Sequence, residues 1–196
     1  MVLNKASETA ALSPAARAAH RRILTAFAET GHADACADAC ADAETLAELV
    51  EHDVLALDES GGIRAAYPFS PVPTGHRVAW DGGEAYAMCA IDALGMSAML
   101  GVPVTITSTE PDTEQTVTVH VDNDTARWEP ETAVVFSGQA GDSCCPSVDR
   151  TCGNINFFTS ADAGNEWAAR NPGVVGIVLD QRDALAAGVA EFGAML

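Results

Sequence analysis

The run from Ala85 to Val104 limits the possible folds most, because it is mostly apolar over about 20 residues, the length that a membrane-spanning helix needs. The run also contains Asp92, two glycines and Pro103, and acidic residues flank it. These residues disfavour a membrane span, so we expect a buried core helix. Hydrophobic residues make up 48% of the 196-residue chain, enough for the core of one large domain or two small ones.

The charge balance of the chain disfavours polyanionic partners. The chain has 28 acidic and 10 basic residues and a formal net charge of −18, so we expect neither nucleic acid nor an anionic membrane surface to bind it. The first residues show no basic stretch followed by an apolar run, which predicts a cytoplasmic protein. In a reducing compartment, thiols serve metal binding or catalysis more often than disulfides, so the six cysteines are the first functional clue.

The first third of the chain has the element order of a winged helix. Residues 1–12 have no clear pattern and are expected to be a flexible leader without a role. Helices are predicted over Ala15–Glu29, Ala33–Ala43 and Ala43–His52 from capping residues and apolar spacing. A glycine-rich turn then joins two short strands within Val54–Tyr67 as a hairpin.

A proline-rich joint at Phe69–Gly75 predicts a domain boundary. The expected fold class is therefore α+β, with a winged-helix-like domain at 13–70 and a mixed α/β domain at 76–196. Predicted elements of the second domain are strand His76–Trp80, helix Glu84–Leu100, strands Val104–Ser108, Thr116–Val121 and Ala133–Ser137, a strand or loop at Asn154–Thr159, helix Asn165–Arg170, buried strand Val174–Leu179 and helix Arg182–Phe192.

Cys89 and Asp92 are three residues apart on the predicted apolar helix, so both side chains should lie on one face. Apolar surroundings favour the neutral form of a carboxyl group, and an acid kept protonated near neutral pH can deliver a proton. The alternative is structural: Cys89 as a small core residue and Asp92 as a hydrogen-bonded acid.

Three further thiols, Cys144, Cys145 and Cys152, fall within nine residues of a polar segment expected to be a loop. One of them, together with Cys89, would form a two-sulfur site for a soft metal. A structural zinc site built from the three loop cysteines and one more ligand is the competing interpretation. Six residues separate Cys145 from Cys152, which does not fit the usual ligand spacing for zinc.

The remaining candidates carry weaker signals. Cys36 and Cys40 are one helical turn apart and could bind a thiophilic metal, but they lie in a near-repeat of small residues that also fits a structural role. The five histidines are scattered. The sequence contains no zinc-hydrolase, serine-hydrolase, nucleotide-binding or dinucleotide-binding motif.

Two segments together resemble the alkylmercury (organomercurial) lyase family. The first is Tyr86–Asp92, with the pattern Cys-Ala-x-Asp, and the second is Thr151–Ser160, in which a cysteine precedes Phe-Phe. The order of an N-terminal winged-helix-like region and a catalytic domain is similar as well. Some members of the family have a second cysteine directly after the loop cysteine, where this chain has Gly153.

The resemblance implies an enzyme that breaks carbon–mercury bonds by protonolysis, giving a hydrocarbon and Hg(II), in mercury detoxification. It implies that Cys89 and Cys152 bind the mercury of substrate and product, and that Asp92, beside that mercury, handles the proton. No organic cofactor or resident metal is implied. The implied partners are the organomercurial substrate, small cellular thiols as co-reactants, and a mercuric reductase that receives the ion.

A protein without lyase activity is the other hypothesis. A winged-helix metal sensor would use Cys36 and Cys40, but the predicted recognition helix Glu44–Glu51 has acidic residues and no basic one, which disfavours contact with phosphates. A thiol protein that only sequesters metal would use the same cysteines as the enzyme. The sequence leaves open the preferred organomercurial, the oligomeric state and the roles of Cys144 and Cys145.

Overall fold

The computed structural model describes residues 4–31, 41–140 and 151–196. Its helices are α1 (Lys5–Ala11), α2 (Pro14–Thr30), α3 (Ala43–Glu51), α4 (Ala90–Leu100), the 3-10 turn η1 (Cys152–Asn154), α6 (Ala161–Arg170) and α7 (Gln181–Phe192). Its strands are β1 (Leu55–Leu57), β2 (Ile63–Ala66), β3 (Phe69–Ser70), β4 (His76–Trp80), β5 (Gly83–Ala87), β6 (Val104–Thr109), β7 (Thr116–Asp122), β8 (Thr125–Glu129), β9 (Val134–Ala140), β10 (Ile155–Phe158) and β11 (Val174–Leu179).

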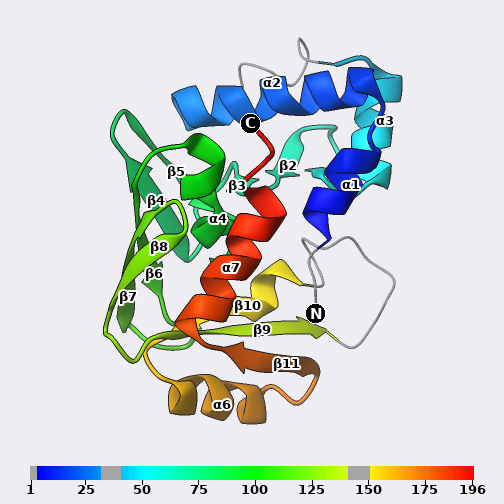
Figure 1. Ribbon diagram of the computed structural model, residues 1–196. Helices are drawn as coiled ribbons and strands as arrows, with labels where there is room; N and C mark the ends of the chain where they lie inside the picture. Colours follow the sequence, from blue (N-terminus) through cyan, green and yellow to red (C-terminus); the bar gives the residue numbers. More distant parts are fainter. Residues whose placement is uncertain (1–3, 32–40, 141–150) are drawn as a thin grey trace.

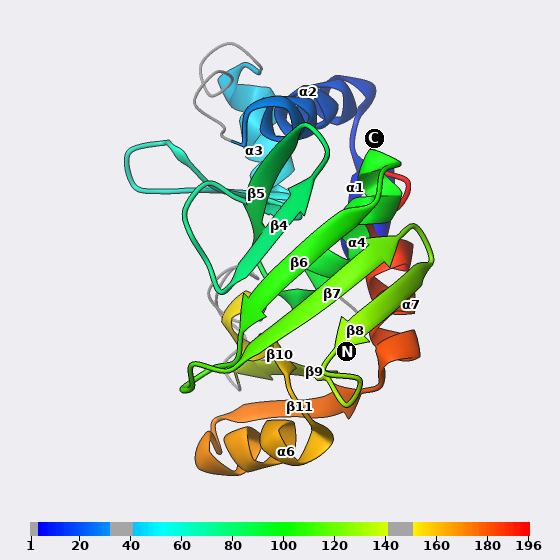
Figure 2. The ribbon, with the colours of Figure 1, turned by 90° about the vertical axis from the view of Figure 1, so that its left-hand side faces the viewer.

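The strands form two antiparallel sheets. The larger has the order β1-β2-β3-β5-β4-β6-β7-β8, and the smaller has the order β10-β9-β11. Helices α4 and α7 lie against each other between the two sheets, and α6 lies beneath the smaller sheet (Figure 1). Seen from the side, β4, β6, β7 and β8 form a twisted layer in front of α4 and α7 (Figure 2). The fold is thus a mixed α/β arrangement around a central helix pair.

Two glycines allow the close approach of the central helices. A Cβ atom added at Gly95 of α4 would lie 2.4 Å from the backbone oxygen of Gly188 in α7. A Cβ atom added at Gly188 would lie 2.7 Å from the backbone nitrogen of Gly95. The contact between α4 and α7 therefore joins backbone to backbone, and it fixes the position of the helix that follows Cys89.

The expected helix over Glu84–Leu100 is wrong in its first half. Gly83–Ala87 is strand β5, which pairs with β4 across the turn at Gly82, and the helix begins only at Ala90. The reason is that a glycine with a φ of 103° at position 82 closes a tight hairpin. Along the strand that follows, Ala85 and Ala87 lie on the buried face and Glu84 and Tyr86 on the other.

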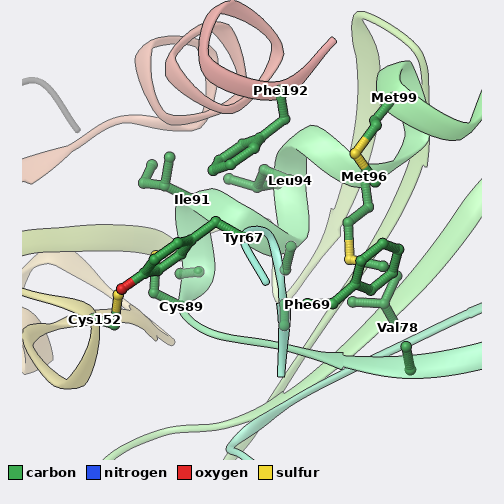
Figure 3. Close-up of a cluster of buried hydrophobic side chains, with 14 of the residues drawn as sticks. Tyr67, Phe69, Val78, Cys89, Ile91, Leu94, Met96, Met99, Cys152 and Phe192 are labelled. Atoms are coloured by element: carbon green, nitrogen blue, oxygen red, sulfur yellow. The ribbon is translucent and has the colours of Figure 1, made fainter. Parts of the chain in front are cut away.

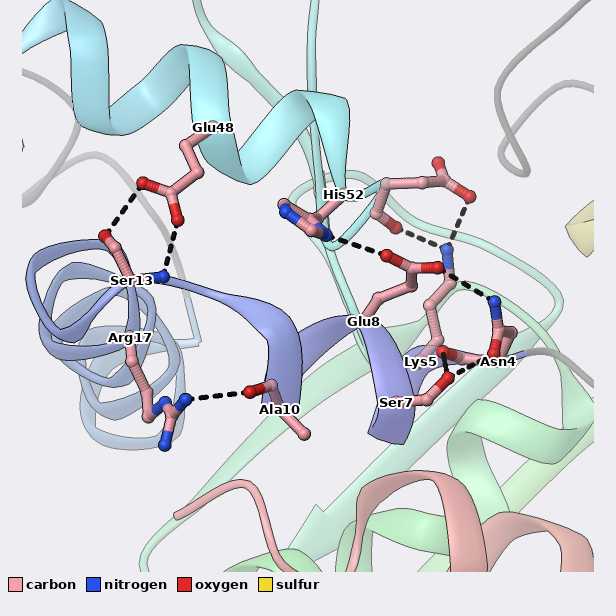
Figure 4. Close-up of polar contacts among 10 residues, drawn as sticks. Asn4, Lys5, Ser7, Glu8, Ala10, Ser13, Arg17, Glu48 and His52 are labelled. Carbon is pink, nitrogen blue, oxygen red and sulfur yellow. Dashed lines mark hydrogen bonds and ion pairs between the residues drawn. The ribbon is translucent and has the colours of Figure 1, made fainter.

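The expectation of a flexible leader over residues 1–12 is also wrong for the described part. Residues Lys5–Ala11 form α1, and Figure 4 shows how it is anchored. Glu8 pairs with the ring of His52 at 2.7 Å, and the carboxylate of Glu191 in α7 accepts hydrogen bonds from the backbone N–H groups of Asn4 and Ala6. Contacts with distant side chains, which local patterns do not reveal, fix this segment.

The hairpin of β1 and β2 is present, but it belongs to the larger sheet, which continues through β3 into β5. One buried cluster also includes residues from both sides of the proline-rich joint, such as Phe27 of α2 and Leu94 of α4. A separate core for 13–70 is therefore not seen. The middle helix of the predicted winged helix falls largely on residues 32–40, outside the described ones, so that arrangement stays a prediction.

Strand β11 was expected to be buried, and this expectation is wrong. It lies at an edge of the smaller sheet, and Val175 and Ile177 are 68% and 56% exposed. A run of β-branched residues marks a strand, but it does not tell whether both faces of that strand are covered. Among the helices of the described residues, none has the length and apolar character to cross a membrane.

Candidate active site

Cys89 lies at the point where β5 ends and α4 begins. It is the N-cap residue of α4, with extended backbone angles, and its sulfur accepts a hydrogen bond from the backbone N–H of Asp92 at 3.5 Å. Asp92 is in the first turn of that helix. The sequence spacing predicts that the two side chains share a helix face. The structure instead brings them together because Cys89 caps the helix that carries Asp92.

Cys152 approaches from a different part of the chain. It opens η1, which leads into β10, and β10 pairs with β9 in the smaller sheet. Figure 3 shows the side chains of Cys89 and Cys152 side by side beneath Tyr67. The structure therefore brings together the three residues that the sequence analysis selected: Cys89, Asp92 and Cys152. They are 0%, 1% and 3% exposed, so the site is closed to bulk solvent.

The carboxyl group of Asp92 is buried. Among the described residues, neither of its carboxyl oxygens has a hydrogen-bond partner. Burial raises the pKa of Asp92 to about 7, while the neighbouring Cys89 thiol and the Lys5 ammonium group oppose the shift. A carboxyl group with a pKa near neutrality can both accept and donate a proton under working conditions.

Burial also raises the pKa of the Cys89 thiol well above its ordinary value, and the adjacent Cys152 thiol and Asp92 carboxyl group add to the shift. The backbone N–H of Asp92 acts in the opposite direction but does not outweigh burial. Cys89 therefore rests as a neutral thiol. Its conversion to a thiolate needs a base within reach, and Asp92 is the nearby carboxyl group.

Tyr67 and Lys5 belong to this site, although the sequence analysis did not select them. The fully buried ring of Tyr67 carries its hydroxyl to Cys152 (Figure 3). The Lys5 ammonium nitrogen lies 3.7 Å from the centroid of that ring. Lys5 is 1% exposed and pairs with Asp53 at 2.7 Å. The sequence holds one signal for Lys5, because it is the lone lysine of the chain.

The other cysteines cannot be placed. Cys36, Cys40, Cys144 and Cys145 all lie outside the described residues. Within residues 4–31, 41–140 and 151–196, no group of three or more His, Cys, Asp and Glu side chains could hold a metal ion. The zinc site considered for the loop cysteines thus involves positions that the structure does not describe, and it stays an untested alternative.

A surface hollow of about 660 Å³ lies elsewhere, on the sheet formed by β4, β6, β7 and β8. Its lining includes Trp80 and Arg127 but none of Cys89, Asp92 and Cys152. It contains no thiol and no buried acid. The two thiols and the buried acid therefore lie in the closed site and not in this hollow.

The closed site combines two soft ligands with a proton carrier. Two thiols that share one buried space suit a soft, two-coordinate metal centre better than a hard cation. A carboxyl group beside one of these thiols can take up the proton that the sulfur releases when it binds metal. The arrangement can hold an organometallic group by its metal and supply a proton to the attached carbon.

Known proteins are similar in sequence to this chain. The sequence profile of the alkylmercury lyase family matches residues 69–193. The alkylmercury lyase of Staphylococcus epidermidis is 37% identical over 117 residues, which are 59% of this chain and 53% of that protein. The alkylmercury lyase of Bacillus cereus is 34% identical over 135 residues, which are 67% of this chain and 59% of that protein. The chain thus matches little more than half the length of these relatives.

The fold has a counterpart among solved structures. The mercury-bound form of MerB2 superposes with a TM-score of 0.75 at 23% sequence identity, covering 96% of this chain and 95% of that one. At this identity the likeness concerns the fold. The sequence profile covers more than half of the chain, including Cys89, Asp92 and Cys152. The chain belongs to the alkylmercury lyase family.

Proposed function

We propose that this protein is an organomercurial lyase, an enzyme that breaks carbon–mercury bonds by protonolysis. The observation that carries the proposal is the convergence of two buried thiols, Cys89 and Cys152, with a buried carboxyl group whose oxygens have no hydrogen-bond partner in the described part of the chain. An unpartnered buried acid destabilises a fold, so its presence beside two thiols supports a chemical role.

The proposed reaction balances as R–Hg–X plus two thiols giving R–H, HX and Hg(II) bound to two thiolates. Asp92 takes the proton of one thiol while that sulfur binds mercury, and it passes this proton to X⁻, which leaves as HX. The second sulfur then binds, and its proton passes through Asp92 to the carbon, which leaves as R–H while both electrons of the carbon–mercury bond go to the new carbon–hydrogen bond. Two sulfur ligands make this step easier, because they increase the electron density on mercury and on its carbon.

The surroundings suit the organic group of such a substrate. Ile91, Leu94 and Phe192 are buried apolar side chains in the cluster that includes Tyr67 and both thiols (Figure 3). An apolar site excludes water, which leaves the carboxyl group of Asp92 as the proton source. We therefore propose alkyl and aryl mercury compounds as the substrate class.

The product ion needs an acceptor, because Hg(II) on two thiolates dissociates little by itself. Two small thiols can exchange with it, giving a free mercury dithiolate and restoring the protons of Cys89 and Cys152. We propose cellular thiols as this acceptor, with a mercuric reductase as the next protein, and a cytoplasmic location where such thiols are abundant. The reaction as written requires no organic cofactor and no resident metal.

The decisive experiment measures benzene release from phenylmercury in the presence of excess small thiol. We expect multiple turnovers for the wild type and a fall of at least about a hundredfold for Cys89→Ser, Cys152→Ser and Asp92→Asn. A matched control is Asp162→Asn, because Asp162 is in the first turn of α6 as Asp92 is in that of α4 but is exposed. This control should retain wild-type turnover.

The outcome separates the lyase from a protein that only sequesters metal. Tight mercury binding without hydrocarbon release by the wild type would contradict the proposal and favour sequestration. Full activity of any of the three site variants would contradict the roles given to these residues. A metal sensor is the less supported alternative, since the described helix α3 carries acidic and no basic residues.

A further inference from the structure

The hydroxyl group of Tyr67 is a buried polar group that the reaction above does not use. Tyr67 is 0% exposed, and its hydroxyl oxygen has no hydrogen-bond partner among the described residues. The hydroxyl points to the sulfur of Cys152 (Figure 3). A phenylalanine would fill the same space without burying an unpartnered oxygen. The hydroxyl therefore needs an explanation that apolar packing does not give.

Lys5 holds the ring of Tyr67 from the other side. Its ammonium nitrogen lies 3.7 Å from the ring centroid and donates hydrogen bonds to the backbone oxygen and the carboxylate of Asp53. The backbone N–H of Tyr67 donates to the oxygen of Val54 at 3.3 Å, which fixes the other end of the residue. A cation over the face of a desolvated aromatic ring is a favourable contact, so Lys5 restricts the direction in which the hydroxyl points.

We propose that Tyr67 is a positioning residue of the lyase reaction, whose hydroxyl donates a hydrogen bond to the sulfur of Cys152 while that sulfur holds mercury, with Lys5 clamping the ring in place. The inference rests on the proposed function, because it assigns mercury to Cys152. In the metal-free protein a neutral thiol is a weak acceptor, which fits the unpartnered hydroxyl. Sulfur bound to mercury carries more negative charge and accepts a hydrogen bond better.

The surroundings keep the hydroxyl in its donating form. Burial raises the pKa of Tyr67, and the proximity of Cys152, Asp53 and Asp92 raises it further. The proton therefore stays on the Tyr67 oxygen at neutral pH. The chain's other tyrosine, Tyr86, is only half-buried in β5, and because side chains alternate along a strand it lies on the face opposite Ala85 and Ala87.

Tyr67→Phe tests the hydroxyl while keeping the ring and its contact with Lys5. We expect kcat for benzene release to fall about tenfold, the loss that removal of one hydrogen bond to a charged group gives, with KM changed less than about twofold because both thiols remain. The ultraviolet charge-transfer band of the protein loaded with Hg(II) should move to longer wavelength, because the sulfur lone pairs lose a stabilising donor. Tyr86→Phe is the matched control and should change neither quantity.

The clamp has its own test in Lys5→Met and Lys5→Arg. Methionine removes the charge over the ring, so kcat should fall and the band should move in the direction seen for Tyr67→Phe. Arginine keeps a cation that can contact both Tyr67 and Asp53, and should restore most of the activity. Circular dichroism of each variant identifies any loss of fold. If Lys5→Met misfolds, the Tyr67→Phe result decides whether the Tyr67 hydroxyl contacts the sulfur of Cys152.

Failure of this inference differs from failure of the proposed function. A wild type that turns over phenylmercury, with a Tyr67→Phe variant of equal kcat and unchanged band, would overturn only the role of Tyr67. A lower kcat with an unchanged band would also overturn it, because the hydroxyl would then act without contacting the mercury-bound sulfur. A wild type that releases no benzene would overturn the lyase function, and the mercury band would still test the hydrogen bond.

Discussion

The sulfur of Cys89 caps the helix that carries Asp92, accepting the Asp92 backbone N–H at 3.5 Å. The same atom is therefore the end of a secondary-structure element and one of the two proposed mercury ligands. In the proposed reaction, mercury bound to this sulfur therefore lies beside the first turn of α4 and its carboxyl group. The start of α4 thus fixes the distance between the Cys89 sulfur and the Asp92 carboxyl group.

Cys89→Ser and Cys89→Ala should differ in stability but not in activity. Serine is a good N-cap residue and keeps an acceptor for the Asp92 N–H, whereas alanine loses it at a cost of about 1 kcal/mol in the free energy of unfolding. Both variants lack the thiol and should release no benzene above background. Urea unfolding measures the first effect, and equal destabilisation of the two variants would contradict the capping role.

Asp92→Asn should change how stability depends on pH. The pKa of Asp92 is raised to about 7 in the folded protein from a reference value of 3.8, so ionisation destabilises the folded wild type as pH rises between these values. Relative to Asp92→Asn, the wild type should lose about 2.5 kcal/mol of unfolding free energy between about pH 5 and about pH 8. Urea unfolding at both pH values measures this, and a constant difference between the two proteins would contradict the raised pKa.

His76→Gln should show the opposite dependence. Burial lowers the pKa of His76 from 6.5 to about 4, so the unfolded chain takes up a proton that the folded protein does not. The wild type should therefore lose stability as pH falls below about 6.5, and the variant should lose roughly 2 kcal/mol less between about pH 7 and about pH 4.5. His20, also buried with a lowered pKa, is present in both proteins and its contribution cancels. Parallel stability curves would count against this account.

Gly95→Ala should destabilise the protein strongly. Its Cβ atom would lie 2.4 Å from the Gly188 oxygen, so α4 and α7 would have to move apart at a cost of about 3 kcal/mol. Gly173→Ala is the control, because no atom lies within 4 Å of the position of its Cβ atom. Thermal unfolding of both variants checks the difference, and a Gly95→Ala protein as stable as the control would refute the close helix contact.

Glu191→Gln should loosen the N-terminal helix. The Glu191 carboxylate accepts the backbone N–H groups of Asn4 and Ala6, and an amide oxygen is a weaker acceptor than a charged carboxylate. Hydrogen exchange of the amides in α1 should become faster, on the order of tenfold for a loss of about 1.4 kcal/mol, while α6 exchanges as before. Unchanged exchange in α1 would show that other contacts hold the helix.

The sequence revealed the site residues better than it revealed their setting. Cys89 and Asp92 could be selected as a thiol and an acid in one apolar segment, whereas the resemblance to alkylmercury lyases singled out Cys152 among the three loop cysteines. The start of α4 could not be located, because Gly83–Ala87 has small and apolar residues that suit a helix as well as a strand, and only pairing with β4 decides. Strand β8 was missed, since it has just one buried large residue, Trp128.

Lys5 and Tyr67 escaped the sequence analysis for a different reason. Their contact joins two segments that are far apart in the chain, and neither segment carries a pattern that refers to the other. A local sequence pattern predicts the secondary structure of its own segment and which face of that segment is buried. It does not predict which distant residue that face contacts. A buried cation over an aromatic ring is visible only once the chain has brought α1 beside β2.

The burial of both sulfurs has a consequence for the timing of each reaction cycle. A molecule as large as an arylmercury cannot reach side chains that are 0% and 3% exposed unless neighbouring groups first part. Entry of substrate and exit of product therefore depend on how often the structure around the site opens. The rate of this opening sets an upper limit on turnover that faster proton transfer cannot exceed. Solvent viscosity should then slow the proposed reaction for those substrates whose carbon–mercury bond is cleaved faster than the site opens.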